Sequence, residues 1–152
     1  MRLQLALNVE DLEAAVAFYS RMFGAAPHKR RPGYANFALE EPPLKLVLFE
    51  QPGARQQLNH LGVEVFDEAA VAEAGARLSA AGLPRRTERD TTCCHARANK
   101  EWTRAPGGLR WEWYRITDDA PAADAVPRAT ATDAAECAPG PQARDCCGSP
   151  SG

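Results

Sequence analysis

Two stretches of the chain follow one pattern: QLALNVEDLEAAVAFYSRMFGAAP at residues 4–27 and HLGVEVFDEAAVAEAGARLSAAGLP at residues 60–84. Each begins with apolar and polar residues in alternation, which is typical of a strand with one buried face. Asp11 and Asp67 follow where a helix N-cap would stand, and an amphipathic stretch that ends at a glycine comes next in both copies. The pattern predicts a strand and then a helix in each half of the chain.

Further strands are predicted after each helix. In the first half these are YANFALE (34–40) and LKLVLFE (44–50), separated by EPP; in the second they are KEWTRA (100–105) and LRWEWYRI (109–116), separated by PGG. Each half therefore reads as a strand, a helix and two or three strands. The sequence predicts an α+β fold in which two tandem βαβββ modules form a curved mixed sheet around a metal cleft.

The domain boundary follows from composition. The modules span about 1–52 and 57–118, which together make one domain over 1–118. Residues 119–152 are dominated by Ala, Pro, Asp, Gly and Ser and contain no aromatic residue. Such a segment cannot bury enough apolar surface to offset the entropy lost on ordering. We expect a flexible, disordered C-terminal tail.

Charge and hydropathy exclude several classes of protein. The formal net charge is −2, so the chain lacks the basic field that would bind a nucleic acid or an anionic membrane. The N-terminus turns acidic too early for a signal peptide, and no apolar run has the length of a membrane span. We expect a cytoplasmic protein, either monomer or homodimer, with a small-molecule partner.

A metal site is predicted from the repeat. Gln4 and His60 occupy equivalent positions on the first strands and should face each other. Glu112 lies between two tryptophans, where an ionised carboxylate is costly to bury without a cation or hydrogen-bond donors. The equivalent fourth position is Val47, which leaves an open site with three N/O ligands, suited to a divalent metal. A structural histidine, a solvent-facing glutamate and a surface glutamine are the alternatives.

Two adjacent cysteines, Cys93 and Cys94, form the second candidate feature. Neighbouring thiols are poorly placed for a structural disulfide but can chelate a soft centre such as trivalent arsenic, Cd(II) or Zn(II). The second half carries extra residues here, so we expect a loop. The alternative is a strand on which one thiol is buried as a small apolar group. The other cysteines lie in the tail: Cys137, Cys146 and Cys147.

Several segments together resemble the vicinal-oxygen-chelate superfamily, which includes glyoxalase I, fosfomycin-resistance proteins and extradiol dioxygenases. They are LALNVEDLEAAVAFYSRMFG, PGYANFALEEPPLKLVLFE, LNHLGVEV, TTCCHA and PGGLRWEWY. Within the superfamily they are most similar to the organoarsenical carbon–arsenic lyases and the cadmium-induced proteins. The resemblance covers residues 1–116.

This resemblance implies an Fe(II)- and dioxygen-dependent enzyme that cleaves trivalent organoarsenicals, such as methylarsonous acid and trivalent aromatic arsenicals, to arsenite. Gln4, His60 and Glu112 then take the metal positions, although Ni or Co could occupy them in a crystal. Cys93 and Cys94 take the positions of the catalytic thiolates that bind the substrate.

Two points stay open after the resemblance. The residue after the cysteine pair is usually aromatic in the lyases and is His95 here, which bears on substrate preference. The alternative function is a non-catalytic stress protein that binds cadmium or arsenic through its vicinal cysteines. A glyoxalase-like activity is disfavoured, because Val47 removes the fourth ligand and the activity leaves the cysteines unexplained.

Overall fold

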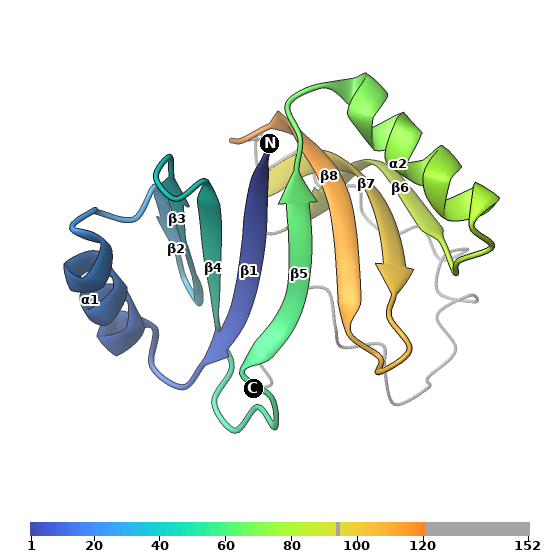
Figure 1. Ribbon diagram of the computed structural model, residues 1–152. Helices are drawn as coiled ribbons and strands as arrows, with labels where there is room; N and C mark the ends of the chain where they lie inside the picture. Colours follow the sequence, from blue (N-terminus) through green and yellow to red (C-terminus); the bar gives the residue numbers. More distant parts are fainter. Residues whose placement is uncertain (94, 121–152) are drawn as a thin grey trace, which may run out of the picture.

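The fold is described here from a computed structural model, for residues 1–93 and 95–120 (Figure 1). Cys94 and residues 121–152 lie outside the described residues. The predictions of a flexible tail and of a role for the tail cysteines concern those residues, so they stay predictions. None of the helices in the described part of the chain is long and apolar enough to cross a bilayer.

The two predicted βαβββ modules are confirmed. The first contains β1 (Arg2–Val9), α1 (Leu12–Phe23), β2 (Lys29–Arg31), β3 (Tyr34–Leu39) and β4 (Leu44–Glu50). The second contains β5 (Leu58–Glu64), α2 (Glu68–Ala80), β6 (Arg86–Cys93), β7 (Ala96–Arg104) and β8 (Arg110–Asp118).

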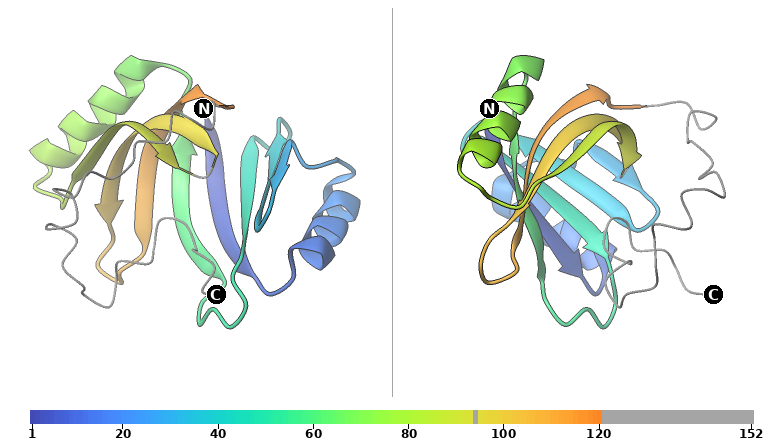
Figure 2. Two further views of the ribbon diagram at one scale, coloured as in Figure 1. Left: turned by 180° about the vertical axis from the view of Figure 1, so that it is seen from behind. Right: turned by 90° about the vertical axis from the view of Figure 1, so that its right-hand side faces the viewer.

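All strands of the described residues join in one mixed sheet with the order β2-β3-β4-β1-β5-β8-β7-β6. The modules meet where β1 and β5 pair antiparallel, and each first strand pairs parallel with the last strand of its own module. The sheet curls into a half-barrel, with both helices on its outer side (Figure 2). The three neighbouring strands β1, β5 and β8 therefore share one concave face.

The helix starts agree with the sequence pattern. The side chains of Asp11 and Asp67 accept hydrogen bonds from backbone N–H groups of the first turns, at 2.9 Å and 3.0 Å. The first helix ends at Gly24, which has the left-handed φ of 64° expected of a glycine C-cap. The second helix ends slightly earlier than predicted, because Ala81 provides its cap in a right-handed conformation.

The core and the concave face differ in character. Phe37, Leu46 and Leu48 are fully buried beneath α1, and Val71, a residue of α2, is fully buried as well. Buried polar and charged side chains gather instead on the concave face, namely Gln4, Lys45, His60, Lys100 and Glu112. Because buried polar groups are costly unless they are paired, this face is organised as a site rather than as a second core.

The position expected for the cysteines is wrong in one respect. Cys93 does not lie on an inserted loop but is the last residue of β6, where it pairs with Ala96 of β7. The extra residues of the second module lengthen the hairpin: β6 and β7 have 8 and 9 residues, whereas β2 and β3 have 3 and 6. His95 follows in the turn with a positive φ of 63°.

Candidate metal and substrate site

Three buried side chains meet on the concave face, one from each of β1, β5 and β8. Gln4 Nε2 lies 3.0 Å from His60 Nε2 and 2.6 Å from Glu112 Oε1, and the histidine and carboxylate atoms are 3.2 Å apart. The side chains of His60 and Glu112 are 10% and 3% exposed. The structure thus brings together the three residues that the repeat had singled out.

Gly62 allows this convergence, although the sequence pattern did not single it out. Gln4, Gly62 and Glu112 are register partners across β1, β5 and β8. Adjacent strands are about 4.8 Å apart, so side chains on β1 and β8 can meet above β5 only where the β5 residue between them is small. A Cβ atom on Gly62 would lie 3.0 Å from Glu112 Cγ and 3.2 Å from Gln4 Nε2.

His60 is oriented by a chain of side-chain amides. Arg110 donates to Asn59 Oδ1 at 2.8 Å, and Asn59 Nδ2 donates to Asn8 Oδ1 at 2.8 Å, so the Asn59 oxygen faces the ring. His60 Nδ1 lies 2.7 Å from that oxygen and must donate its hydrogen there. Neutral His60 therefore directs the lone pair of Nε2 into the site, which is the tautomer that a metal ligand requires.

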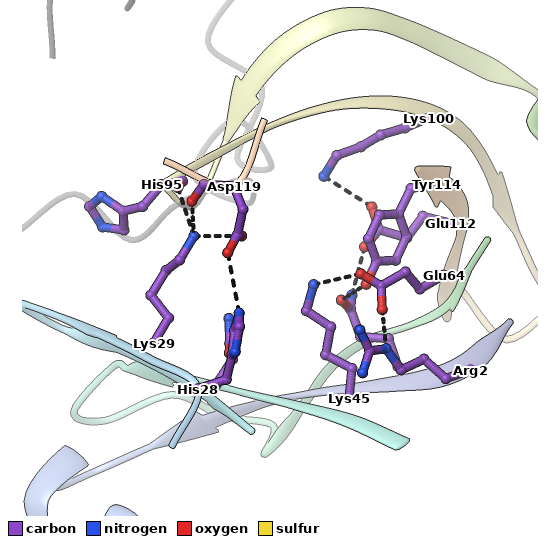
Figure 3. Close-up of polar contacts among 12 residues, drawn as sticks. Arg2, His28, Lys29, Lys45, Glu64, His95, Lys100, Glu112, Tyr114 and Asp119 are labelled. Carbon is purple, nitrogen blue, oxygen red and sulfur yellow. Dashed lines mark hydrogen bonds and ion pairs between the residues drawn. The ribbon is translucent and has the colours of Figure 1, made fainter. Parts of the chain in front are cut away.

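Glu112 is held as a carboxylate although its side chain is almost fully buried. Burial raises its pKa, but the positive charge of Lys100 opposes this shift, and the pKa falls to about 2. Lys100 Nζ forms an ion pair with Glu112 Oε2 at 3.1 Å (Figure 3). The Lys100 ammonium group is not oriented for a hydrogen bond to this oxygen, and no other described residue forms a hydrogen bond to it.

Gln4 can present either end of its amide to the other two groups. As placed, its NH₂ group donates to His60 and Glu112, while Tyr114 donates its hydroxyl hydrogen to Gln4 Oε1 at 2.5 Å. A half-turn of the amide would direct Oε1 into the site, and its NH₂ group would then donate to the Tyr114 oxygen. The hydroxyl serves both orientations, so Gln4 can act as a donor to its neighbours or as a metal ligand.

The donor set fits a divalent metal. One imidazole nitrogen and one carboxylate oxygen, both electron-pair donors, point at the same place, and the amide oxygen joins them after its half-turn. The described residues contain no cluster of three or more His, Cys, Asp or Glu, so the amide is needed to complete a triad. Val47 lines the same cavity at the fourth position and supplies no donor atom.

A cavity of about 240 Å³ lies in front of the three residues. Its aromatic walls are Tyr34, Phe49, Trp102 and Tyr114, and Cys93 lines it as well. The Trp102 and Phe49 rings lie 5.3 Å and 6.4 Å from the His60 ring, measured between centroids. The proposed metal ligands and one thiol thus share a single apolar-walled cavity.

Two lysines also line the cavity, and the sequence pattern did not identify either of them. Lys100 pairs with Glu112, and Lys45 Nζ lies 3.0 Å from Glu64 Oε1. Burial lowers the pKa of Lys45, although the charge of Glu64 opposes the shift. Arg2 contacts the other oxygen of Glu64 (Figure 3). Both lysines lie on strands at alternating inward positions, but only the curl of the sheet brings them to the site.

The comparison with protein families agrees with this fold. The model of the glyoxalase/bleomycin resistance protein/dioxygenase superfamily matches residues 3–113. The chain belongs to this superfamily. Superfamily membership by itself leaves the reaction open, so the individual relatives carry more information.

Two kinds of curated relative are similar over most of the chain. The cadmium-induced protein CadI of Mycobacterium tuberculosis is 56% identical over 127 residues, which cover 84% of each chain. A protein of Thermomonospora curvata named trivalent organoarsenical cleaving enzyme is 52% identical over 139 residues, 91% of this chain and 89% of the relative. A Bacillus sp. enzyme of the same name is 39% identical over 110 residues.

Solved structures of low identity show the same fold. The 2,3-dioxygenase LapB of Pseudomonas sp. KL28 superposes with a TM-score of 0.62 at 19% identity, covering 84% of this chain and 46% of that one. The Mn(II)-bound glyoxalase of Novosphingobium aromaticivorans has a TM-score of 0.58 at 19% identity, covering 77% and 39%. At such identities the likeness is one of fold alone.

Gly62→Ala should weaken metal binding with little effect on folding. The added methyl group displaces the side chains of Glu112 and Gln4 by a few tenths of an ångström, and we expect the affinity of this candidate site for a divalent metal to fall about 10- to 100-fold. Competition with a chelating dye measures this affinity. Gly107→Ala is the matched control, since a Cβ there meets nothing within 4 Å. Equal affinity in both variants would contradict the role of Gly62.

The low pKa of Glu112 predicts a specific acid sensitivity of the metal-free protein. Because its pKa in the folded state is about 2, below the usual 4.5, ionisation of Glu112 stabilises the fold above about pH 4.5. This stabilisation decreases by about 2 kcal/mol between about pH 5 and about pH 3. Urea unfolding at both pH values, compared with Glu112→Gln, measures it. The same loss in the variant would show that other carboxylates account for it.

Proposed function

We propose that this protein is an Fe(II)- and dioxygen-dependent lyase that cleaves the carbon–arsenic bond of trivalent organoarsenicals and releases arsenite. The observation that carries the proposal is the shared cavity, which is lined by the thiol of Cys93 and by Gln4, His60 and Glu112. A soft thiolate and a set of harder N/O donors favour different partners. An arsenical substrate and a metal cofactor can therefore bind side by side without competing for the same protein ligands.

The thiol of Cys93 suits trivalent arsenic. Arsenic(III) is thiophilic, and two thiolates would hold it while leaving its organic group in place. Cys94 would supply the second thiolate by its adjacency in sequence, although it lies outside the described residues. Binding through Cys93, which lines the cavity, would hold the arsenical next to the proposed metal ligands.

The remaining side chains would position the substrate. The rings of Tyr34, Phe49 and Trp102 form apolar walls that favour an organic substituent and exclude water from the reacting carbon. Such fixed placement turns an encounter of reactants into a reaction within one complex. Iron, when bound by Gln4, His60 and Glu112, would supply the activation of dioxygen.

The reaction balances with one molecule of dioxygen. Methylarsonous acid and O₂ contain the same atoms as arsenous acid and formaldehyde. The carbon–arsenic bond breaks, the carbon is oxidised, and the two oxygen atoms of O₂ are reduced and divided between the products. No further reductant is needed. Arsenite, formaldehyde and consumed O₂ should therefore appear in equal amounts.

A second candidate function is non-catalytic binding of cadmium or arsenic. The 56% sequence identity to a protein named cadmium-induced favours it, as does the preference of thiolates for Cd(II). In this case the cysteines would hold the ion and the N/O residues would take no part.

The experiment that separates the two functions uses the full chain with Cys137, Cys146 and Cys147 changed to serine, so that tail thiols cannot contribute. The Fe(II)-loaded protein is mixed anaerobically with methylarsonous acid, air is admitted, and arsenite and formaldehyde are quantified. Repeated turnover with equal product amounts supports the lyase. Stoichiometric retention of arsenical or Cd(II) without either product supports the binding protein.

A further inference from the structure

We propose that Lys29 is a positioning residue for substrate: it ties the β6–β7 hairpin, and with it Cys93, to the opposite edge of the sheet. This inference rests on the proposed function, in which Cys93 binds the arsenical. Lys29 touches neither the cavity nor the three residues proposed to bind the metal. Its role would be to fix where the thiol lies relative to them.

The Lys29 side chain is buried and fully paired, although β2 is an edge strand of the sheet. Its side chain is 7% exposed, and its ammonium group donates to His95 O at 3.2 Å, to Asp119 Oδ1 at 2.6 Å and to the carbonyl oxygen of Asp119 (Figure 3). An ammonium group has three hydrogens to donate, so the set of acceptors is complete. The other carboxylate oxygen of Asp119, Oδ2, lies 3.2 Å from His28 Nε2.

These contacts join parts of the fold that strand pairing leaves apart. β2 and β6 are the two edges of the curled sheet, and no backbone ladder connects them. Lys29, on β2, reaches the hairpin at His95 and the chain just after β8 at Asp119. The side chain thereby closes the half-barrel across its open side.

Tyr34 of the first module makes a second contact with the same hairpin. The Tyr34 ring of β3 packs edge-on against the His95 ring with centroids 5.6 Å apart, and Tyr34 also lines the cavity. Cys93 lies two residues before His95, at the end of β6. Fixing the carbonyl of His95 therefore limits how far the thiol can swing away from the cavity.

The chemistry of the link explains why a charge is used here. A buried ammonium group is costly to desolvate, and the cost is offset only if its acceptors keep their geometry. An apolar contact at this edge would tolerate sliding of the hairpin, whereas three directed hydrogen bonds do not. Burying Lys29 thus costs some folding free energy, and its directed hydrogen bonds fix the position of the hairpin.

The test compares Lys29→Met with Arg31→Met in the full chain that lacks the three tail cysteines. Arg31 lies on the same strand and is exposed, which makes it a matched control. Three quantities are measured: the Kd for phenylarsine oxide, a probe for paired thiols; the Kd for Fe(II); and hydrogen exchange of the backbone amides in the 91–98 hairpin. We expect Lys29→Met to raise the arsenical Kd about tenfold and to speed exchange in the hairpin, with the Fe(II) Kd unchanged.

Lys29→Arg should restore part of the arsenical affinity, because it keeps donors at the same position. If Lys29→Met does not fold, Asp119→Asn tests the same link. An unchanged arsenical Kd, or a parallel loss of arsenical and Fe(II) affinity, would overturn the proposal. Failure of the lyase itself is a different result: the wild-type protein would then bind phenylarsine oxide, with the Lys29 dependence intact, but release no arsenite from methylarsonous acid.

Discussion

Glu112→Gln is expected to lower the affinity for Fe(II) by more than about 100-fold and to abolish carbon–arsenic cleavage. The substitution keeps the shape of the side chain but removes the only anionic oxygen among the three converging groups. It also leaves Lys100 facing a neutral amide, which should destabilise the fold by about 3 kcal/mol. Metal titration and calorimetry measure the two effects separately.

Glu64→Gln is the matched control for this prediction. Glu64 is also buried on the concave face and pairs with a buried lysine, Lys45, but it is not among the three converging side chains. It should therefore cost similar stability while the affinity for Fe(II) is retained. If both variants bind iron equally, whether tightly or weakly, Glu112 is not a specific ligand.

Cys93→Ser has the second large expected effect. A serine hydroxyl is a poor ligand for arsenic(III). In the chain whose three tail cysteines are changed to serine, binding of trivalent arsenicals and release of arsenite should therefore both fall below detection. The affinity for Fe(II) should not change, because Cys93 is not one of the N/O donors. Isothermal titration with phenylarsine oxide and with Fe(II) measures both.

The tail pair provides the control for the thiol prediction. Changing Cys146 and Cys147 to serine alters an equally vicinal pair that lies outside the described residues, and cleavage should continue at the wild-type rate. Loss of cleavage in this double variant, with Cys93→Ser still active, would move the substrate thiols to the tail and contradict the account.

Local and repeated features made much of the fold predictable. The N-caps at Asp11 and Asp67 mark the helix starts, and the alternation before them marks the first strands. Because the two modules repeat, equivalence of Gln4 and His60 predicted their contact without any knowledge of the sheet order. Glu112 stood out because a carboxylate flanked by tryptophans needs a partner.

The rest depends on geometry that only the assembled sheet has. Gly62 matters because it lies in register between Gln4 and Glu112. The local sequence pattern does not determine the register between neighbouring strands. Lys29 matters because the sheet curls until its edges face each other. Cys93 was expected on a loop because added residues usually lengthen loops, whereas here they lengthen a hairpin.

The central claim is that Gln4, His60 and Glu112 form a metal site facing Cys93, and anomalous diffraction from crystals of the Fe(II)-loaded protein tests it most directly. The account predicts an iron peak within coordination distance of His60 Nε2, Glu112 Oε1 and Gln4 Oε1, with the amide of Gln4 turned so that its NH₂ group meets the Tyr114 hydroxyl. An iron peak at Cys93, or at any position away from these three side chains, would contradict it.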